Sequence, residues 1–431
     1  MELAILVVFI VGYLGITTEH FLRIDKSAIA LLTGVGCWAI YFIQHSAQME
    51  LAESSLMHHV QEIASILLFL MGAMTIVELI DAHDGFRIIT DRITAKRKSS
   101  LLWIICAVTF FMSALLDNLT TAIVMTSLNR KLIDDIKLRH LFGGMVILSA
   151  NAGGAWSPIG DVTTTMLWIS GSITTSGIIG KLLLPSIAGM ILPLLILQFR
   201  LKGEINRPAE SSTSQIVSNR DRLIVFCTGV ATLLLVPVIK QTTHLPPFMG
   251  MMFSLGILWL VTELLHGKKI MEEKSRYSAL QALRKIDMPS VLFFLGILLA
   301  VASLGEVGYL NALAVQLQQT LGSTFQINVA IGVISSIVDN VPLVAAAITM
   351  YPVQEMITAD PWLSQFMCDG NFWSLLALTA GTGGSLLIIG SAAGVAVMGM
   401  EKISFGWYLR NITPLAIISY AFSCMVYWWM M

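Results

Sequence analysis

Charged residues are scarce in this sequence. Only 12% of its 431 residues are Asp, Glu, Lys or Arg, whereas an average soluble domain has about 25%. The 26 basic and 27 acidic residues leave a net charge of −1, so the chain has no excess of positive charge with which to attract nucleic acid. With 56% hydrophobic residues, the composition disfavours a soluble globule and excludes a disordered chain. We therefore expect a membrane protein whose main surroundings are the lipid bilayer.

Cysteine pairs and catalytic signatures are also lacking. The five cysteines stand singly in apolar stretches, without a CxxC pair or a neighbouring histidine pattern: Cys37, Cys106, Cys227, Cys368 and Cys424. This pattern predicts neither a disulfide framework nor a metal site, and we expect no bound cofactor. There is no HExxH, P-loop or Ser/His/Asp arrangement, so the sequence does not indicate an enzyme.

Long apolar stretches are abundant. A membrane-spanning helix needs about 20 mostly apolar residues, and ten stretches could supply one each: 2–17, 26–44, 60–80, 139–171, 177–199, 222–239, 247–266, 288–305, 371–400 and 407–430. The first has no basic residue before Arg23, unlike a cleaved signal peptide, and is expected to remain as a span. The sequence thus predicts an all-α polytopic membrane protein with about ten transmembrane helices.

Two further apolar stretches, 98–128 and 325–352, do not fit a simple crossing. Each is too long for one comfortable span and too short for two, which would need about 40 residues. We expect both to be re-entrant hairpins that enter and leave the membrane on the same side.

The basic residues test this arrangement, because cytoplasmic loops carry an excess of Lys and Arg. They gather at 23–26, 87–98, 130–139, 200–222 and 267–287, whereas the expected loop 45–59 and the two flanks of the second stretch, 306–324 and 353–370, have none. Both flanks of the first hairpin are therefore basic and both flanks of the second are not. The distribution predicts that the first hairpin enters from the cytoplasm, the second from outside, and that both chain termini lie outside.

The two halves of the chain resemble each other at matched places. LFLMG at 68–72 matches LFFLG at 292–296, and SALLDN at 113–118 matches SSIVDN at 335–340. Because each half has five crossings, corresponding helices should point in opposite directions. We predict an inverted repeat, with a first unit at 1–199, a cytoplasmic linker at 200–221 and a second unit at 222–431. Such repeats with glycine-interrupted segments are typical of secondary transporters.

Asp117 and Asp339 lie inside the two expected hairpins, and a serine precedes each by four residues, Ser113 and Ser335. A carboxylate at membrane depth costs several kcal/mol unless it is paired or hydrated. One interpretation is that each acid only caps the returning helix. The other is that it binds a cation, and the two roles can coexist.

A third acid, Asp161, lies in NAGGAWSPIGDVTTT at 151–165, where two glycines and a proline make a continuous helix improbable. We expect a helix broken near the membrane midplane, whose free carbonyls and polar side chains suit a hard cation. The glycines could instead serve close helix packing. The candidate oxygen donors are Ser149, Asn151, Asp161, Thr163 and Thr164, with Thr379, Thr382, Ser385 and Ser391 around the equivalent GTGGSLLIIGS at 381–391.

The histidines His58, His59, His83 and His140 fall in or near expected loops. We expect them to be solvated rather than to act as pH sensors.

The segments SALLDNLTTAIVM, NAGGAWSPIGDVTTTMLWISG and SSIVDNVPLV resemble the NhaD-type sodium/proton antiporters of the ion transporter superfamily. The resemblance implies that hairpin tips and helix breaks form two symmetry-related regions near the midplane. It also implies a homodimer with scaffold and transport domains, the latter moving like an elevator. Transport roles are implied for Ser113, Asp117, Asn118, Thr120, Thr121, Asn151, Asp161, Thr163, Thr164, Ser335, Asp339 and Asn340.

We expect a transporter that exchanges Na+, with Li+ as a second candidate, for H+ by alternating access. Intramembrane carboxylates would bind either ion, with Na+ at Asp117, Asn118, Asp339 and Asn340, and Asp117 as the first choice. The alternative is a sodium-coupled anion transporter for dicarboxylates or oxyanions. Dicarboxylate carriers of the superfamily have Ser-Asn-Thr at the hairpin tips, and aspartate there disfavours an anionic substrate. We expect a bacterial inner membrane, although an organelle of bacterial descent would look similar.

Overall fold

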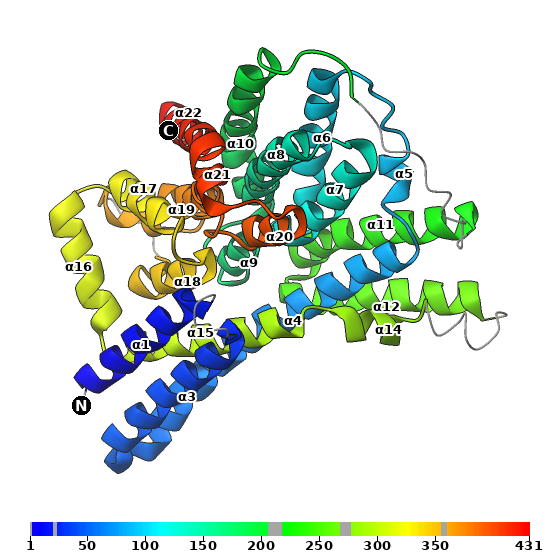
Figure 1. Ribbon diagram of the computed structural model, residues 1–431. Helices are drawn as coiled ribbons and strands as arrows, with labels where there is room; N and C mark the ends of the chain where they lie inside the picture. Colours follow the sequence, from blue (N-terminus) through cyan, green and yellow to red (C-terminus); the bar gives the residue numbers. More distant parts are fainter. Residues whose placement is uncertain (1, 20–23, 206–217, 268–276, 355–359) are drawn as a thin grey trace.

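The computed structural model describes residues 2–19, 24–205, 218–267, 277–354 and 360–431. In these ranges the chain is built of helices, with isolated bridges at Arg97–Glu204 and Gln354–Met367. Figure 1 shows their arrangement. The α-helices are α1 (Glu2–Thr17), α3 (Lys26–Gln44), α4 (Met49–Ala82), α5 (Arg87–Thr90), α6 (Lys98–Ser113), α7 (Asn118–Leu132), α8 (Ile136–Ala155), α9 (Val162–Ile169), α10 (Thr175–Gln198), α11 (Asn219–Thr243), α12 (Pro247–His266), α14 (Ala279–Lys285), α15 (Met288–Glu306), α16 (Tyr309–Leu321), α17 (Thr324–Ile334), α18 (Asn340–Met350), α19 (Asn371–Gly383), α20 (Ala392–Glu401), α21 (Phe405–Asn411) and α22 (Thr413–Met430).

Six of these helices are long and apolar enough to cross a membrane, and a seventh is added if α21 and α22, bent by 53°, count as one span. Large apolar side chains are exposed on their outer faces, among them Leu32, Leu264 and Trp429. Such a surface fits lipid and not water. The predicted count of ten stays a prediction, because the other predicted spans are short or broken helices.

Helix ends follow local sequence signals. Asp25 caps α3 by accepting the Ser27 N–H at 2.8 Å, and Thr174 caps α10 by accepting the Gly177 N–H at 3.0 Å. The helices α12 and α15 both have a proline in the first turn, where its missing N–H is not needed. The predicted boundaries of 2–17, 26–44 and 247–266 agree with α1, α3 and α12.

One predicted loop is wrong. Residues 45–59 form only a short 3-10 turn, Ser46–Gln48, before α4 begins at Met49. The stretch after the turn lacks proline and glycine and is rich in helix-forming residues, so nothing stops the helix from starting early. At 34 residues α4 is about 50 Å long, which exceeds the hydrocarbon thickness of a bilayer.

Helix–turn–helix units occur where the two hairpins were predicted. In the first, α6 and α7 are separated by 114–117, and in the second, α17 and α18 are separated by 335–339. In both units an aspartate, Asp117 or Asp339, is the residue just before the second helix. Whether the units re-enter the membrane from opposite sides stays a prediction.

Both predicted breaks are present. The first separates α8 from α9 at 156–161, and the second separates α19 from α20 at 384–391. Asp161 caps α9 and Ser391 caps α20, so each new short helix starts at a polar side chain within the apolar core.

The two halves repeat the same contacts at matched positions. The Ser113 hydroxyl donates to the Ala150 carbonyl at 2.6 Å, and the Ser335 hydroxyl donates to the Ala380 carbonyl at 2.8 Å. Gly153 likewise lies directly against the backbone of Phe110, as Gly383 does against Gly332. Each hairpin is thus held against the broken helix of its own half by the same two contacts, a serine-to-carbonyl hydrogen bond and a close glycine–backbone contact.

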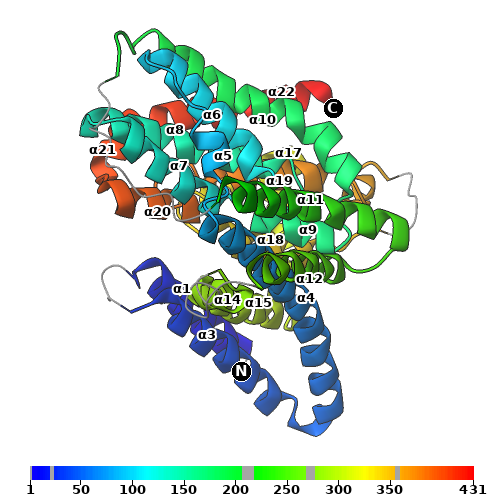
Figure 2. The same ribbon diagram turned by 90° about the vertical axis from the view of Figure 1, so that its right-hand side faces the viewer.

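The helices pack as two groups. The first, which we call the arm group, comprises α1, α3, α4, α11, α12 and α15, and the second, the core group, comprises α6 to α10 and α17 to α22. Figure 2 shows α1, α3 and α15 in a layer below most of the core group, with α4 running through both layers. The groups meet where α15 packs on α18 and α4 packs on α9. Each group takes helices from both halves, so the packing groups do not coincide with the predicted repeat units. Most of the predicted linker, 206–217, lies outside the described residues.

Close packing of the hairpins on the broken helices gives a stability prediction. A methyl group on Gly383 would come well under 3.0 Å from the Gly332 carbonyl, which is backbone and cannot yield. We expect Gly383→Ala to destabilise the protein by about 1–3 kcal/mol, seen as a lower melting temperature in detergent. Gly256→Ala is the control, because a methyl group on this helical glycine meets nothing within 4 Å. Equal melting temperatures for the two variants would contradict the expectation.

Candidate functional site

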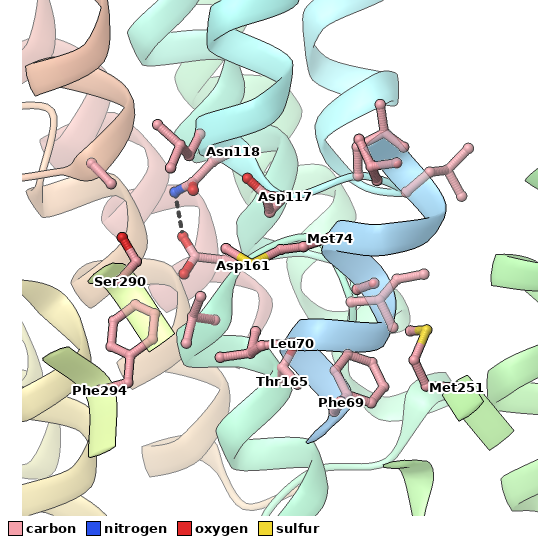
Figure 3. Close-up of a pocket in the computed structure, with 18 of the residues that line it drawn as sticks. Phe69, Leu70, Met74, Asp117, Asn118, Asp161, Thr165, Met251, Ser290 and Phe294 are labelled. Carbon is pink, nitrogen blue, oxygen red and sulfur yellow. Dashed lines mark hydrogen bonds between the residues drawn. The ribbon is translucent and has the colours of Figure 1, made fainter. Parts of the chain in front are cut away.

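A cavity of ≈ 70 Å³ lies where the two helix groups meet. The core group contributes Asp117, Asn118, Asp161 and Asp339, and the arm group contributes Lys26 and a wall of apolar side chains. Figure 3 shows Asp117, Asn118 and Asp161 on one side, with Leu70, Met74 and Phe294 around them. The carboxylates that the sequence singled out in two hairpins and one helix break are therefore brought to one place.

Asp161 is the most enclosed of these acids, at 2% exposed. Its Oδ1 accepts the backbone N–H and the hydroxyl of Thr163, both at 3.0 Å. Its Oδ2 accepts the side-chain amide of Asn118 at 2.7 Å (Figure 3). The acid thus joins the first hairpin tip to the first helix break.

Asn151 extends this network into the other half of the chain. Its Oδ1 accepts the Asn118 amide at 3.0 Å, and its own Nδ2 donates to the hydroxyls of Ser385 at 2.8 Å and Ser391 at 3.1 Å. All these polar groups are buried and each bond satisfies a group that lies out of reach of water. The sequence named Asn118, Asn151, Asp161 and Ser385 separately, and the structure joins them in one network.

Asp117 lies at the start of α7 and lines the cavity. Its two carboxylate oxygens accept the Thr120 N–H and the Thr120 hydroxyl, each at 2.7 Å. Asp161 caps α9 in the same way, and Asp339 caps α18 by accepting the Val341 N–H at 3.1 Å. Capping and a place in the cavity therefore coexist at all three acids, as the second interpretation allowed.

Asp339 has a basic partner that the sequence placed elsewhere. The Lys26 ammonium lies 3.5 Å from the Asp339 carboxylate and 4.4 Å from the centre of the Phe293 ring. Charge counting used Lys26 only as a marker of the cytoplasmic face, which stays a prediction, and its place at the cavity is an addition from the structure. No periodic pattern could have shown it, since the contact spans more than 300 residues.

The remaining predicted site residues divide by position. Ser113 and Ser335 fasten the hairpins, Thr164 donates to the Asp161 carbonyl at 2.9 Å, and Thr382 donates to the Leu378 carbonyl at 2.5 Å. Thr121, Ser149 and Asn340 are buried nearby on α7, α8 and α18. Of the four residues predicted to hold Na+, Asp117, Asn118 and Asp339 line the cavity, and Asn340 does not.

The chemistry of the cavity favours a cation. Three carboxylates face one ammonium group, so the described lining has an excess of negative charge when the acids are ionised. Carboxylate, amide and hydroxyl oxygens are the ligands of hard cations. The site can also exchange protons, because each carboxylate can take up either a proton or a metal ion.

A second polar cluster, away from the cavity, was missed from the sequence. The buried Glu401 carboxylate accepts Arg130 Nε at 2.8 Å and Arg139 Nε at 3.1 Å, and its carbonyl oxygen is 2.9 Å from His140 Nε2. These contacts fix the end of α20 to α7 and α8.

One histidine prediction is wrong. His83 is fully buried at the end of α4, stacked on His266 with the two Nε2 atoms 2.8 Å apart. Packing of α12 against α4 brings the two rings together, which loop position alone could not reveal.

The chain is similar to known transporters over nearly its whole length. The family described as citrate transporter, CitMHS, matches residues 4–368. Sodium/proton antiporter 1 of Arabidopsis thaliana is 45% identical, over 99% of this chain and 72% of its own length. The Na(+)/H(+) antiporter NhaD of Vibrio cholerae is 31% identical, over 98% of this chain and 91% of its own. The crystal structure of the YdaH transporter of Alcanivorax borkumensis has a TM-score of 0.59 at 10% identity, covering 89% of this chain and 88% of that one, and shares the fold.

The network around Asn151 gives a second stability prediction. Asn151→Ala removes three buried hydrogen bonds, to Asn118, Ser385 and Ser391, which we expect to lower the free energy of unfolding by about 1–3 kcal/mol. Asn411→Ala is the control, because Asn411 is exposed and donates only to the Trp407 carbonyl of its own helix. A melting temperature of Asn151→Ala equal to that of Asn411→Ala would show that the network contributes no stability.

Proposed function

This chain belongs to the citrate transporter family and, within it, to the NhaD-type sodium/proton antiporters, and from this premise we propose that it exchanges Na+ for H+ across a membrane. One observation carries the proposal beyond family membership: three carboxylates from two hairpins and a helix break line one cavity. Li+ is a second candidate ion, since it is also a small hard cation. The Na+ and H+ are substrates and not resident cofactors.

Coupling of Na+ transport to H+ transport requires only that the two ions compete for the same carboxylates. When Asp117 or Asp161 is ionised, the cavity attracts Na+, and when it is protonated, that attraction is lost. The same site then carries one ion in each direction, provided that it opens to the two sides in turn. We assign this role first to Asp117 and Asp161, with Asp339 as their counterpart in the second half.

Alternating access is supported by the two packing groups. The cavity lies on the contact between them, so that a displacement of the core group relative to the arm group would move the acids as a unit. The matched hairpins and breaks are what an inverted repeat would produce. In Figure 1 both chain termini lie on the left, opposite the first residues of α11 and the last residues of α12. This arrangement supports a topology with both termini on the side opposite the predicted cytoplasmic loops, which is the outside. A homodimer and a bacterial inner membrane are proposed from the resemblance to the NhaD-type antiporters alone.

The alternative, a sodium-coupled anion transporter, draws support from the family description as citrate transporter. Citrate carries up to three negative charges, and three carboxylates at the cavity would repel it. Lys26 alone, already 3.5 Å from Asp339, cannot offset this repulsion. The lining therefore favours a cation as substrate.

Purified protein in liposomes with an internal pH dye separates these functions. For Na+/H+ exchange, external NaCl should make the interior more alkaline, because Na+ enters as H+ leaves. Potassium chloride should give no such change. Citrate or succinate uptake that depends on Na+, without proton movement, would establish the anion transporter instead.

Loss of charge at the acids should stop exchange without unfolding the chain. An asparagine side chain still caps a helix but cannot ionise, so Asp117→Asn should fold normally and lose Na+-dependent proton flux. Asp161→Asn should lose the same flux at some cost in melting temperature, because its new amide group would face the donating Asn118 amide. Asp134→Asn, at an exposed position, is the matched control. Normal exchange with normal sodium dependence in either site variant would remove that acid from the mechanism.

Competition also predicts a pH dependence. A lower pH protonates the acids, so the Na+ concentration at half-maximal rate should rise, approaching about tenfold per pH unit where one proton competes. The maximal rate should change far less. Initial rates measured over a range of Na+ at several pH values check this, and a pH effect on the maximal rate alone would contradict shared binding.

A further inference from the structure

The ammonium group of Lys26 is placed where a transported cation would be attracted. Among the described residues it is the one basic side chain that lines the cavity, together with the three acids. We propose that Lys26 is a built-in competitor of the transported cation, which holds Asp339 while the cavity is empty and is displaced when the cation enters. This inference rests on the proposed cation exchange.

The backbone of Lys26 is anchored to the arm group. Asp25 caps α3 through the Ser27 N–H, and the Ser27 hydroxyl donates to the Pro289 carbonyl of α15 at 2.7 Å. The Lys26 N–H itself lies 3.3 Å from a carboxylate oxygen of Glu19. The flexible part is therefore the side chain, whose ammonium group reaches across to the core group.

Asp339 presents one oxygen to this ammonium group. Its Oδ1 accepts the Val341 N–H at the start of α18, and its Oδ2 faces Lys26 Nζ at 3.5 Å. A tight charge-assisted hydrogen bond is about 2.7–2.9 Å long, so the pair is held loosely. Its side chains are 31% and 23% exposed, which leaves the ammonium group free to move away.

The other charges at the cavity explain why displacement follows binding. Asp117 and Asp161 line the same space, and Lys26 offsets part of the field of all three acids. A bound Na+ supplies the missing positive charge and repels the ammonium group. Conversely, removing the ammonium group leaves more negative potential for Na+, so that the affinity should increase.

A merely structural ion pair makes a different prediction. Partly exposed pairs contribute little to stability, and their loss leaves ion affinity unchanged. The two roles are therefore separated by the Na+ concentration at half-maximal exchange and not by the melting temperature.

The experiment compares Lys26→Gln and Lys26→Arg in proteoliposomes. We expect Lys26→Gln to lower the half-maximal Na+ concentration by about tenfold. This is the effect of removing one positive charge a few ångströms from the bound cation in a partly hydrated site. Lys26→Arg keeps the charge and should stay near wild type. Lys137→Gln, at an exposed position on α8, is the control.

In this comparison, two outcomes overturn the proposal: a wild-type half-maximal concentration in Lys26→Gln, or the same change in Lys26→Arg as in Lys26→Gln. Absence of Na+/H+ exchange in the wild-type protein would instead overturn the proposed function. The two failures are thus distinguishable in one set of vesicles.

A measurement on the wild-type protein does not depend on whether the variants fold. Displacement should expose the Lys26 amine, so an amine-reactive reagent should modify Lys26 faster in NaCl than in choline chloride, with Lys137 as the internal reference. Mass spectrometry of the digested protein gives the ratio. A ratio that is unchanged or lowered by Na+ overturns the competitor role.

Discussion

A carboxylate in an apolar helical core must be compensated, and in this protein helix N-termini supply compensation that all three acids share. Asp117, Asp161 and Asp339 each accept a backbone N–H at the start of a helix. Such a start is available inside an apolar core only where a helix has just been interrupted. The hairpin tips and the break after α8 are thus the condition for keeping the acids there. Other parts of the fold hold these helix interruptions close together: the glycines allow the hairpins to pack closely, and the buried asparagine network links them.

The sequence predicted the parts of the fold that depend on local signals. The lengths of the apolar stretches predicted the bounds of α1, α3 and α12, and glycine and proline predicted the break between α8 and α9. Both signals act within a single helix. It failed where no local signal existed. The early start of α4 follows from the absence of a breaker, and the burial of His83 follows from contact with His266 on another helix.

The candidate site shows the same division. Asp117, Asp161 and Asp339 could be singled out, because an acid in an apolar stretch needs a reason wherever it lies. Their convergence on one cavity could only be expected from resemblance and matched repeats. Two features depend on how distant segments pack: the position of Lys26 at the cavity and the hydrogen bonds by which Asn151 connects the two halves. The order of charges along the chain carries no information about such packing.

The wall that the arm group turns toward the cavity is almost wholly hydrocarbon. Phe69, Leu70, Met74 and Phe294 face the acids from that side, and Ser290 there donates to Asp287. A dehydrated ion would have no strong ligand on this wall, so it would have no bond to the wall that must break when it leaves. If the core group moves relative to the arm group, as proposed, an ion held by the acids would travel together with its ligands and would break no bond to the arm group.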